Sequence, residues 1–214
     1  MELRRRGWPV IVPDLHSEGV VENRPYYQQH AQNAAKSLQK LAENEPLILV
    51  AHSGAGPLLP AIRQELHQPV VAYLFVDAGI AHDGQSRLEM LANELPEMAS
   101  RFRELLIAGQ RWPQWSDADL AKSIPDANWR QRLLAELTPQ PLAFFNEPIP
   151  VFADWPDAPC AYLQFTAGYD YSAAEAARLS WPVVRLEVGH FHMLVDETAV
   201  TDQILMLLND LNLA

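Results

Sequence analysis

The chain has 214 residues, a length that suits one folded unit carrying an insertion better than two independent domains. Hydrophobic residues make up 49% of it and charged residues 20%, which is ordinary for a globular protein and excludes a disordered chain. Its 27 acidic residues outnumber 16 basic ones, and the formal net charge of -11 repels phosphate backbones and anionic lipid surfaces on average. We therefore expect neither a nucleic-acid nor a membrane partner.

The predicted elements alternate between strand and helix along most of the chain. Short apolar, β-branched runs predict strands, and apolar residues at spacings of three and four predict helices. We expect strands at 10–12, 47–50, 70–76, 161–165 and 183–188, and helices at 26–44, 54–66, 172–179 and 197–211. This alternation is typical of an α/β fold with a mostly parallel sheet flanked by helices.

The alternation breaks between residues 80 and 155. This stretch shows amphipathic helical patterns and proline-rich joints but no convincing parallel strand. We expect residues 1–79 and 156–214 to form the core. Residues 80–155 then form a helical cap or lid, inserted after the third strand of the chain.

A single cysteine, Cys160, means that no intrachain disulfide can form, and a cytoplasmic location is the default expectation. Because Cys160 opens an apolar strand, we expect a buried, inert thiol rather than a nucleophile. No apolar run reaches the ~18 residues that a membrane span needs. The N-terminus carries no apolar signal-peptide segment either.

The segment after the strand at 47–50 has the pattern of a nucleophile elbow, a sharp turn that lifts a serine out of a strand. Ser53 lies at this corner, and the residues two before and two after it, Ala51 and Ala55, are small as the turn requires. The Gly54 N–H then begins the next helix and can donate to a developing oxyanion. The alternative is that Ser53 merely caps that helix.

A serine hydroxyl needs a neighbouring base, because it is a weak nucleophile at neutral pH. His190 follows the last predicted strand, and Gly189 frees the backbone just before it. His192 lies two residues further on, and the pair suits a metal, but no third ligand stands at a recognisable spacing. We therefore predict His190 as the base, no metal site and no cofactor.

An acidic partner should hold the histidine tautomer and stabilise its imidazolium form. Asp170 follows the penultimate strand and precedes His190, which gives the chain order Ser, Asp, His. Asp77 also ends a strand and is the rival, while Asp196 suits the start of the last helix better. We predict Asp170 as the acid.

Three segments together resemble the α/β-hydrolase family: PVIVPDL at 9–15, LVAHSGAG at 49–56 and GHF at 189–191. The resemblance covers nearly the whole chain. It implies that these segments are the family's fourth strand, its nucleophile elbow and its catalytic histidine loop, and that the insertion is a lid. Members of this family include esterases, lipases, epoxide hydrolases and hydroxynitrile lyases, so the fold does not name the substrate.

One departure from the family concerns the start of the chain. The family's third strand, with the loop that gives a second oxyanion N–H, should precede Val10, yet only nine residues do so here. Residues 1–6 followed by Gly7 resemble the end of the intervening helix. We therefore expect an N-terminally truncated hydrolase, with the 10–12 strand moved to pair with the 47–50 strand and with activity weakened by the loss of one oxyanion donor.

Aromatic residues of the insertion predict an apolar pocket near Ser53. We expect its lining to include His52, Trp112, Trp115 and Phe144. The small-molecule substrate is then a small hydrophobic ester, cleaved in the manner of a carboxylesterase. The alternatives are a hydroxynitrile-lyase-like enzyme and a catalytically impaired binding module. An unpaired sheet edge would also favour a homodimer.

Overall fold

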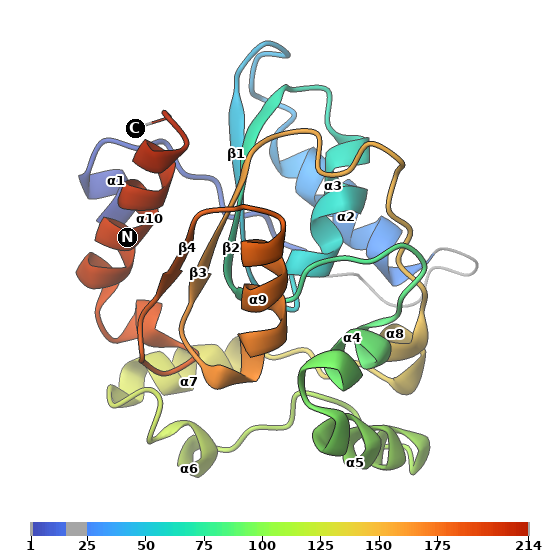
Figure 1. Ribbon diagram of the computed structural model, residues 1–214. Coiled ribbons are helices and arrows are strands. Elements are labelled where there is room, and N and C mark those ends of the chain that lie inside the picture. Colours follow the sequence, from blue (N-terminus) through green and yellow to red (C-terminus); the bar gives the residue numbers. More distant parts are fainter. Residues whose placement is uncertain (1, 16–24, 214) are drawn as a thin grey trace.

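A parallel β-sheet forms the centre of the molecule (Figure 1). The computed structural model describes residues 2–15 and 25–213. Within these residues the sheet has four strands, and their spatial order follows the chain. They are β1 (Leu47–Ser53), β2 (Val70–Ala78), β3 (Cys160–Gln164) and β4 (Val183–Arg185). All neighbouring strands are parallel, so their carboxyl ends meet at one end of the sheet.

The two central strands carry the buried core. Tyr73 and Phe75 of β2 face one side and pack with Ala173 and Ala176, while Leu74 and Val76 face the other side. Alternation along a strand explains this division, because successive side chains point to opposite faces. A helix from the C-terminal part of the chain covers the second face with four apolar residues, Val200, Ile204, Leu207 and Leu208.

Helices cover both faces of the sheet, as Figure 1 shows. On one side α1 packs against α10, and Arg6, the residue after α1, forms an ion pair with Asp202 of α10 at 2.9 Å. On the other side α9 and α3 lie on the sheet, and α2 packs on α3. Their bounds are α1 (Glu2–Arg5), α2 (Tyr26–Ser37), α3 (Leu59–Glu65), α9 (Asp170–Arg178) and α10 (Glu197–Asp210). Short 3₁₀ turns precede or link them: η1 (Gly56–Leu58), η2 (Ala167–Tyr169) and η3 (His192–Leu194).

The segment between β2 and β3 is helical, and it lies at the end of the sheet where the strands finish (Figure 1). Ser86 and Ser116 each begin a helix with a capping box, which satisfies N–H groups that the first turn leaves unpaired. The sequence prediction placed this insertion after a third strand, but it follows the second. The helices are α4 (Arg87–Glu94), α5 (Pro96–Ile107), α6 (Asp117–Leu120), α7 (Ala127–Glu136) and α8 (Leu142–Asn146).

The predicted strand at 10–12 is wrong. Residues 8–15 are in no strand, and Ile11 and Val12 are 44% and 70% exposed. Pro9 and Pro13 flank the run, and a proline has no N–H to give to a sheet ladder. β1 is therefore the edge of the sheet, with Val50 47% exposed.

Two predicted helices are shorter than the pattern indicated. The helix at 26–44 ends at Ser37, after which turns such as Leu41 N–H to Leu38 C=O, at 2.9 Å, continue the chain. The helix at 54–66 begins as the η1 turn around Pro57, and α3 follows it. Periodicity alone does not separate such turns from a regular helix.

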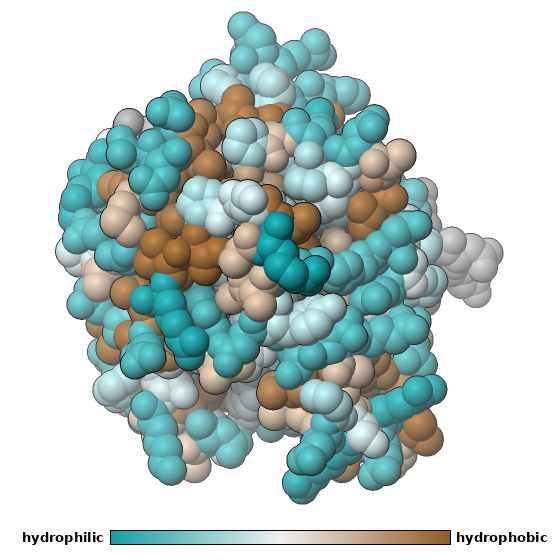
Figure 2. Space-filling model, in the orientation of Figure 1, coloured by the Kyte–Doolittle hydropathy of each residue, from teal (hydrophilic) through white to brown (hydrophobic). Residues whose placement is uncertain are grey.

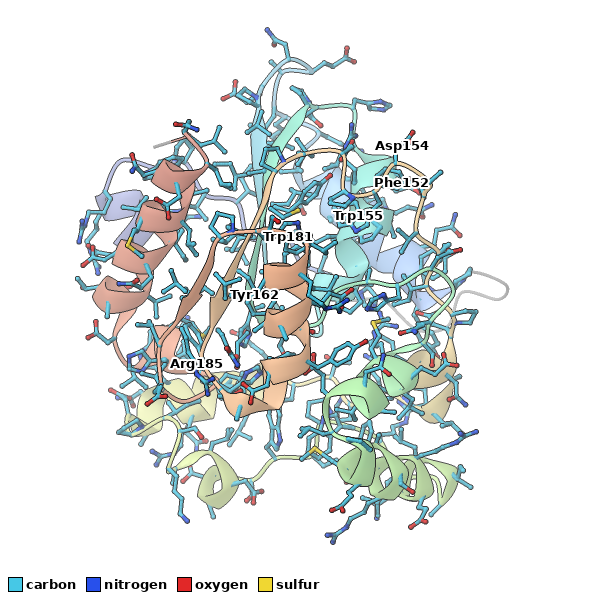
Figure 3. All side chains as sticks on the ribbon, viewed as in Figure 1. Phe152, Asp154, Trp155, Tyr162, Trp181 and Arg185 are labelled. Carbon is cyan, nitrogen blue, oxygen red and sulfur yellow. The ribbon has the colours of Figure 1, made fainter. Side chains whose placement is uncertain are left out.

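The surface seen in Figure 2 is mostly hydrophilic, with hydrophobic residues gathered over the strands between α9 and α10. Figure 3 shows Trp155 and Trp181 near one end of α9. Trp181 stacks on Phe75 with ring centroids 5.3 Å apart, and Trp155 meets Tyr73 edge-on at 4.5 Å. Among the described residues no helix has the length and apolar character to cross a bilayer.

Candidate active site

Ser53 occupies a strained corner at the end of β1. Its φ is +56°, in the left-handed region that side chains other than glycine rarely adopt. The β1 register against β2 shifts between His52 and Ser53, so the chain leaves the regular ladder at this residue. This backbone is what the elbow pattern predicts, and it turns the hydroxyl out of the strand.

The turn after Ser53 passes very close to the end of β2. A Cβ on Gly56 would lie 2.1 Å from the Gly79 carbonyl oxygen, so only glycine fits there. Gly54 is the opposite case, since a Cβ there would meet no atom within 4 Å. No hydrogen bond found among the described residues uses the Gly54 N–H, and this donor therefore lies open beside Ser53.

His190 meets Ser53 from the loop after β4. Its Nε2 lies 3.0 Å from Ser53 Oγ. His52 supports that loop, because its ring Nε2–H donates to the His190 carbonyl oxygen at 2.9 Å. Burial, with the neighbouring His190 as the second cause, lowers the pKa of His52 to about 4. His52 is thus a neutral support at physiological pH.

Asp77, and not Asp170, is the carboxylate that contacts His190. Its Oδ2 lies 2.6 Å from His190 Nδ1. The Asp77 side chain is fully buried and accepts further hydrogen bonds from the N–H groups of Phe165 and Thr166, at 2.8 and 2.9 Å, and from Thr166 Oγ1, at 3.0 Å. Burial pushes the pKa of Asp77 upward, but the bond from His190 and the two N–H groups outweigh it and hold the pKa below its ordinary value.

The prediction that Asp170 would face the histidine is therefore wrong. Asp170 is the first residue of α9, and its Oδ1 accepts from Gln164 Nε2 at 2.6 Å and faces Arg185 Nη1 at 3.4 Å. Figure 3 shows Arg185 beside this end of α9. The η2 turn after β3 accounts for the difference, because it carries Asp170 outward while Thr166 faces Asp77.

Tyr169 is a site residue that the sequence reasoning missed. Its hydroxyl oxygen lies 3.1 Å from Ser53 Oγ, and its ring lies nearly parallel to that of His190, with centroids 5.6 Å apart and planes at 12°. Burial raises the pKa of Tyr169 to about 12, so the hydroxyl is protonated at neutral pH. The available signal was its place in a loop after a strand end, next to the residue predicted as the acid.

An aromatic series connects the site to the insertion. Trp115 meets Phe191, the neighbour of His190, with centroids 5.5 Å apart, and Trp112 meets Trp115 at 5.6 Å. The predicted pocket residue Phe144 is further from the histidine loop: it meets Tyr26 of α2 at 5.5 Å and Phe145 at 4.9 Å, and Phe102 links Phe145 to Trp112. Trp112 and Trp115 therefore stand on the side of the insertion that reaches the histidine loop.

A serine at a strained corner, a histidine and a buried aspartate thus stand in hydrogen-bonded series at the carboxyl end of a parallel sheet. A series of this kind at the carboxyl end of a parallel sheet is the arrangement that a nucleophile, its base and its acid adopt in serine-dependent α/β enzymes. The model of the Alpha/beta hydrolase family matches residues 1–203. The chain belongs to the alpha/beta hydrolase family.

Solved structures share this fold at low sequence identity. An extracellular alpha/beta-hydrolase from a Paenibacillus species is 19% identical, with a TM-score of 0.72 over 95% of this chain and 88% of that one. Tomato methylketone synthase I, as a variant complexed with beta-ketoheptanoate, is 12% identical, with a TM-score of 0.68 over 98% and 90%. A polyneuridine aldehyde esterase mutant is 14% identical, with a TM-score of 0.65 over 95% and 89%. Among the curated proteins no sequence matches this chain.

Proposed function

We propose that this protein is a serine hydrolase that cleaves small hydrophobic carboxylic esters. Ser53 is its nucleophile, His190 its base and Asp77 its acid. The observation that carries the proposal is the unbroken series of contacts from Ser53 Oγ to His190 Nε2, at 3.0 Å, and from His190 Nδ1 to Asp77 Oδ2, at 2.6 Å. Both distances allow a hydrogen bond, as a nucleophile and its base require.

Asp77 fixes which nitrogen of His190 carries the proton. An ionised carboxylate only accepts hydrogen bonds, so the Nδ1–H donates to Asp77. Nε2 is then left bare and accepts the Ser53 O–H. This tautomer makes His190 a base toward Ser53, and the nearby negative charge stabilises the imidazolium that forms.

The first half of the reaction forms an acyl-enzyme. Ser53 Oγ attacks the ester carbonyl carbon while its proton moves to His190 Nε2, and the carbonyl π electrons move to the oxygen. The open Gly54 N–H donates to that anionic oxygen. When the adduct collapses, the bond to the alkoxide oxygen breaks, and the leaving alkoxide takes the proton from Nε2 to become an alcohol.

The second half returns the enzyme to its starting state. A water molecule attacks the acyl carbon and gives one proton to His190 Nε2. The second adduct collapses with cleavage of the bond to Ser53 Oγ, which takes that proton back. The carboxylic acid leaves, and Ser53 and His190 recover their starting protonation.

Substrate class rests on the side chains that adjoin the histidine loop. Phe191, Trp115 and Trp112 form a continuous aromatic series beside His190. An aromatic surface next to the reacting groups favours an apolar acyl or alkoxy group. Two structural neighbours are described as a polyneuridine aldehyde esterase and a pyrethroid hydrolase, and these names agree with hydrolysis as the reaction class.

Activity-based labelling tests the proposal. A fluorophosphonate probe should label the wild-type protein, and Ser53→Ala should abolish both labelling and the hydrolysis of a p-nitrophenyl ester. Ser180→Ala is the matched control, because Ser180 also has a positive φ, +60°, but lies exposed just after α9. Its labelling should equal that of wild type. A well-folded wild-type protein that neither reacts with the probe nor releases p-nitrophenol would contradict the proposal.

A further inference from the structure

Among the described residues, two side chains lie within hydrogen-bond distance of Ser53 Oγ, and the proposed reaction uses one of them. His190 Nε2 lies 3.0 Å from Oγ, and Tyr169 Oη lies 3.1 Å from the same atom. Oγ carries one proton, and in the series ending at Asp77 that proton goes to His190. The bond with Tyr169 must then run the other way, with the Tyr169 O–H donating to Ser53 Oγ. An O–H donor therefore points at the reacting oxygen.

Tyr169 is held in place through hydrogen bonds of the backbone on both sides of it. Its backbone N–H donates to the Thr166 carbonyl oxygen at 3.2 Å, and Thr166 is itself bound to Asp77. α9 begins directly after the η2 turn. In its first turn the N–H groups of Tyr171 and Ser172 donate to the Glu94 carboxylate of α4, at 3.1 and 3.0 Å. A turn fixed at both ends keeps its side chain oriented without reorganisation, which is what transition-state stabilisation requires.

We infer that Tyr169 is a catalytic residue that, together with the Gly54 N–H, donates a hydrogen bond to the anionic oxygen of the tetrahedral adduct. The inference rests on the proposed function, since it concerns the same site. The carbonyl oxygen of a bound ester is separated from Ser53 Oγ by one carbon atom in the adduct. A donor already beside Oγ reaches that oxygen by a small rotation of the hydroxyl, and no proton is transferred to it.

This role suits the chemistry of the group. Because burial holds the pKa of Tyr169 well above neutrality, the phenol remains a neutral donor through the working pH range. In the resting enzyme the Tyr169 O–H donates to Ser53 Oγ, which is a neutral oxygen. The bond to an oxyanion is stronger, so the gain is larger in the transition state than in the ground state.

Tyr169→Phe is the informative variant, because it removes the hydroxyl and keeps the ring beside His190. We expect kcat for a p-nitrophenyl ester and the rate of fluorophosphonate labelling each to fall about 10²-fold, with little change in KM. Tyr171→Phe is the matched control: it removes a hydroxyl two residues away on a side chain that is 42% exposed. Its rates should match wild type, and thermal melting should show that both variants are folded.

The outcomes separate this inference from the proposed function. If wild type is active and Tyr169→Phe reacts as fast or faster, the hydroxyl gives no transition-state stabilisation and the inference is overturned while the function stands. A loss confined to KM would also overturn it, since it would mean that the hydroxyl contributes only to ground-state binding. If wild type itself is inert toward probe and ester, the proposed function fails and the inference falls with it.

Discussion

Asp77 lies at the end of β2 and Asp170 follows the η2 turn after β3, and the two carboxylates differ in burial and in hydrogen-bond partners. Asp77, at the end of β2, is fully buried and accepts hydrogen bonds from His190, Phe165 and Thr166. Asp170, after β3, is exposed at the start of α9 and forms an ion pair with Arg185, with Oδ1 and Nη1 3.4 Å apart. Both aspartates lie near the carboxyl end of the sheet, yet of the two only Asp77 contacts His190.

This difference shows how the surroundings hold one carboxylate, and not the other, ionised against His190. A buried carboxylate stays ionised when enough donors compensate its desolvation, and the loop after β3 gives Asp77 two backbone N–H groups and one hydroxyl. Asp170 was predicted as the acid because it follows β3, but the loop after β3 instead supplies the donors that keep Asp77 charged. Asp170 lies at a helix start, where a carboxylate is favourable without any catalytic role.

Neutralising each aspartate in turn tests whether only Asp77 supports catalysis. Asp77→Asn should lower kcat about 10⁴-fold, because the amide no longer fixes the tautomer of His190 or stabilises its imidazolium form. Asp170→Asn should change kcat less than about twofold, since exposed ion pairs contribute little. Steady-state hydrolysis of one ester by both variants gives the measurement. The assignment of Asp77 would be wrong if the two losses were equal or reversed in size.

A second test extends the comparison to buried and exposed histidines through the pH dependence of unfolding. The pKa of His52 falls from 6.5 to about 4 on folding. Above pH 6.5 both states hold it neutral. Between pH 6.5 and about 4, His52 is protonated in the unfolded chain but not in the folded chain. The free energy of unfolding therefore decreases as the pH falls, by up to about 3 kcal/mol.

Urea unfolding of wild type and His52→Gln across this pH range measures the effect. The variant should lose less stability than wild type as the pH falls, because glutamine does not titrate. His67→Gln, which replaces an exposed histidine, is the control and should follow the wild-type curve. Identical pH slopes for wild type and His52→Gln would contradict the predicted titration.

The smallest expected effect comes from removing one donor to Asp77. Thr166→Val deletes the hydroxyl that lies 3.0 Å from Oδ2 but keeps the backbone N–H. We expect kcat to fall about 10-fold, the value of one hydrogen bond to a charged group. Because the lost donor favoured the ionised form, the acid limb of the pH–rate profile should move to higher pH. Thr198→Val, at an exposed position of α10, should leave both quantities unchanged.

Local patterns were sufficient to predict the four described strands, the sharp corner at Ser53 and the loop that carries His190. The apolar runs at 47–50 and 70–76 predicted β1 and β2, which extend to Ser53 and Ala78, and the small residues around Ser53 predicted its strained corner. The identity of the acid depends instead on the register of β3 against β2 and on the direction of the η2 turn. Neither is encoded in the spacing of Asp77 and Asp170 along the chain.

The strand predicted at 10–12 failed for a related reason. Its β-branched residues fit a strand, but strand formation needs a partner ladder, and none of the described strands pairs with this segment. Tyr169 was missed because its role depends on a contact across 116 residues of sequence. Such contacts appear only when the fold has brought the elbow and the loop after β3 together.

The close passage between Gly56 and the Gly79 carbonyl has a consequence for protein engineering. Any library that randomises the loop after the nucleophile will lose most of its members at position 56, where even a methyl group meets backbone. Position 54 tolerates diversity, because open space surrounds it and every residue except proline retains the N–H. Efforts to broaden substrate range should therefore vary residue 54 and leave residue 56 untouched.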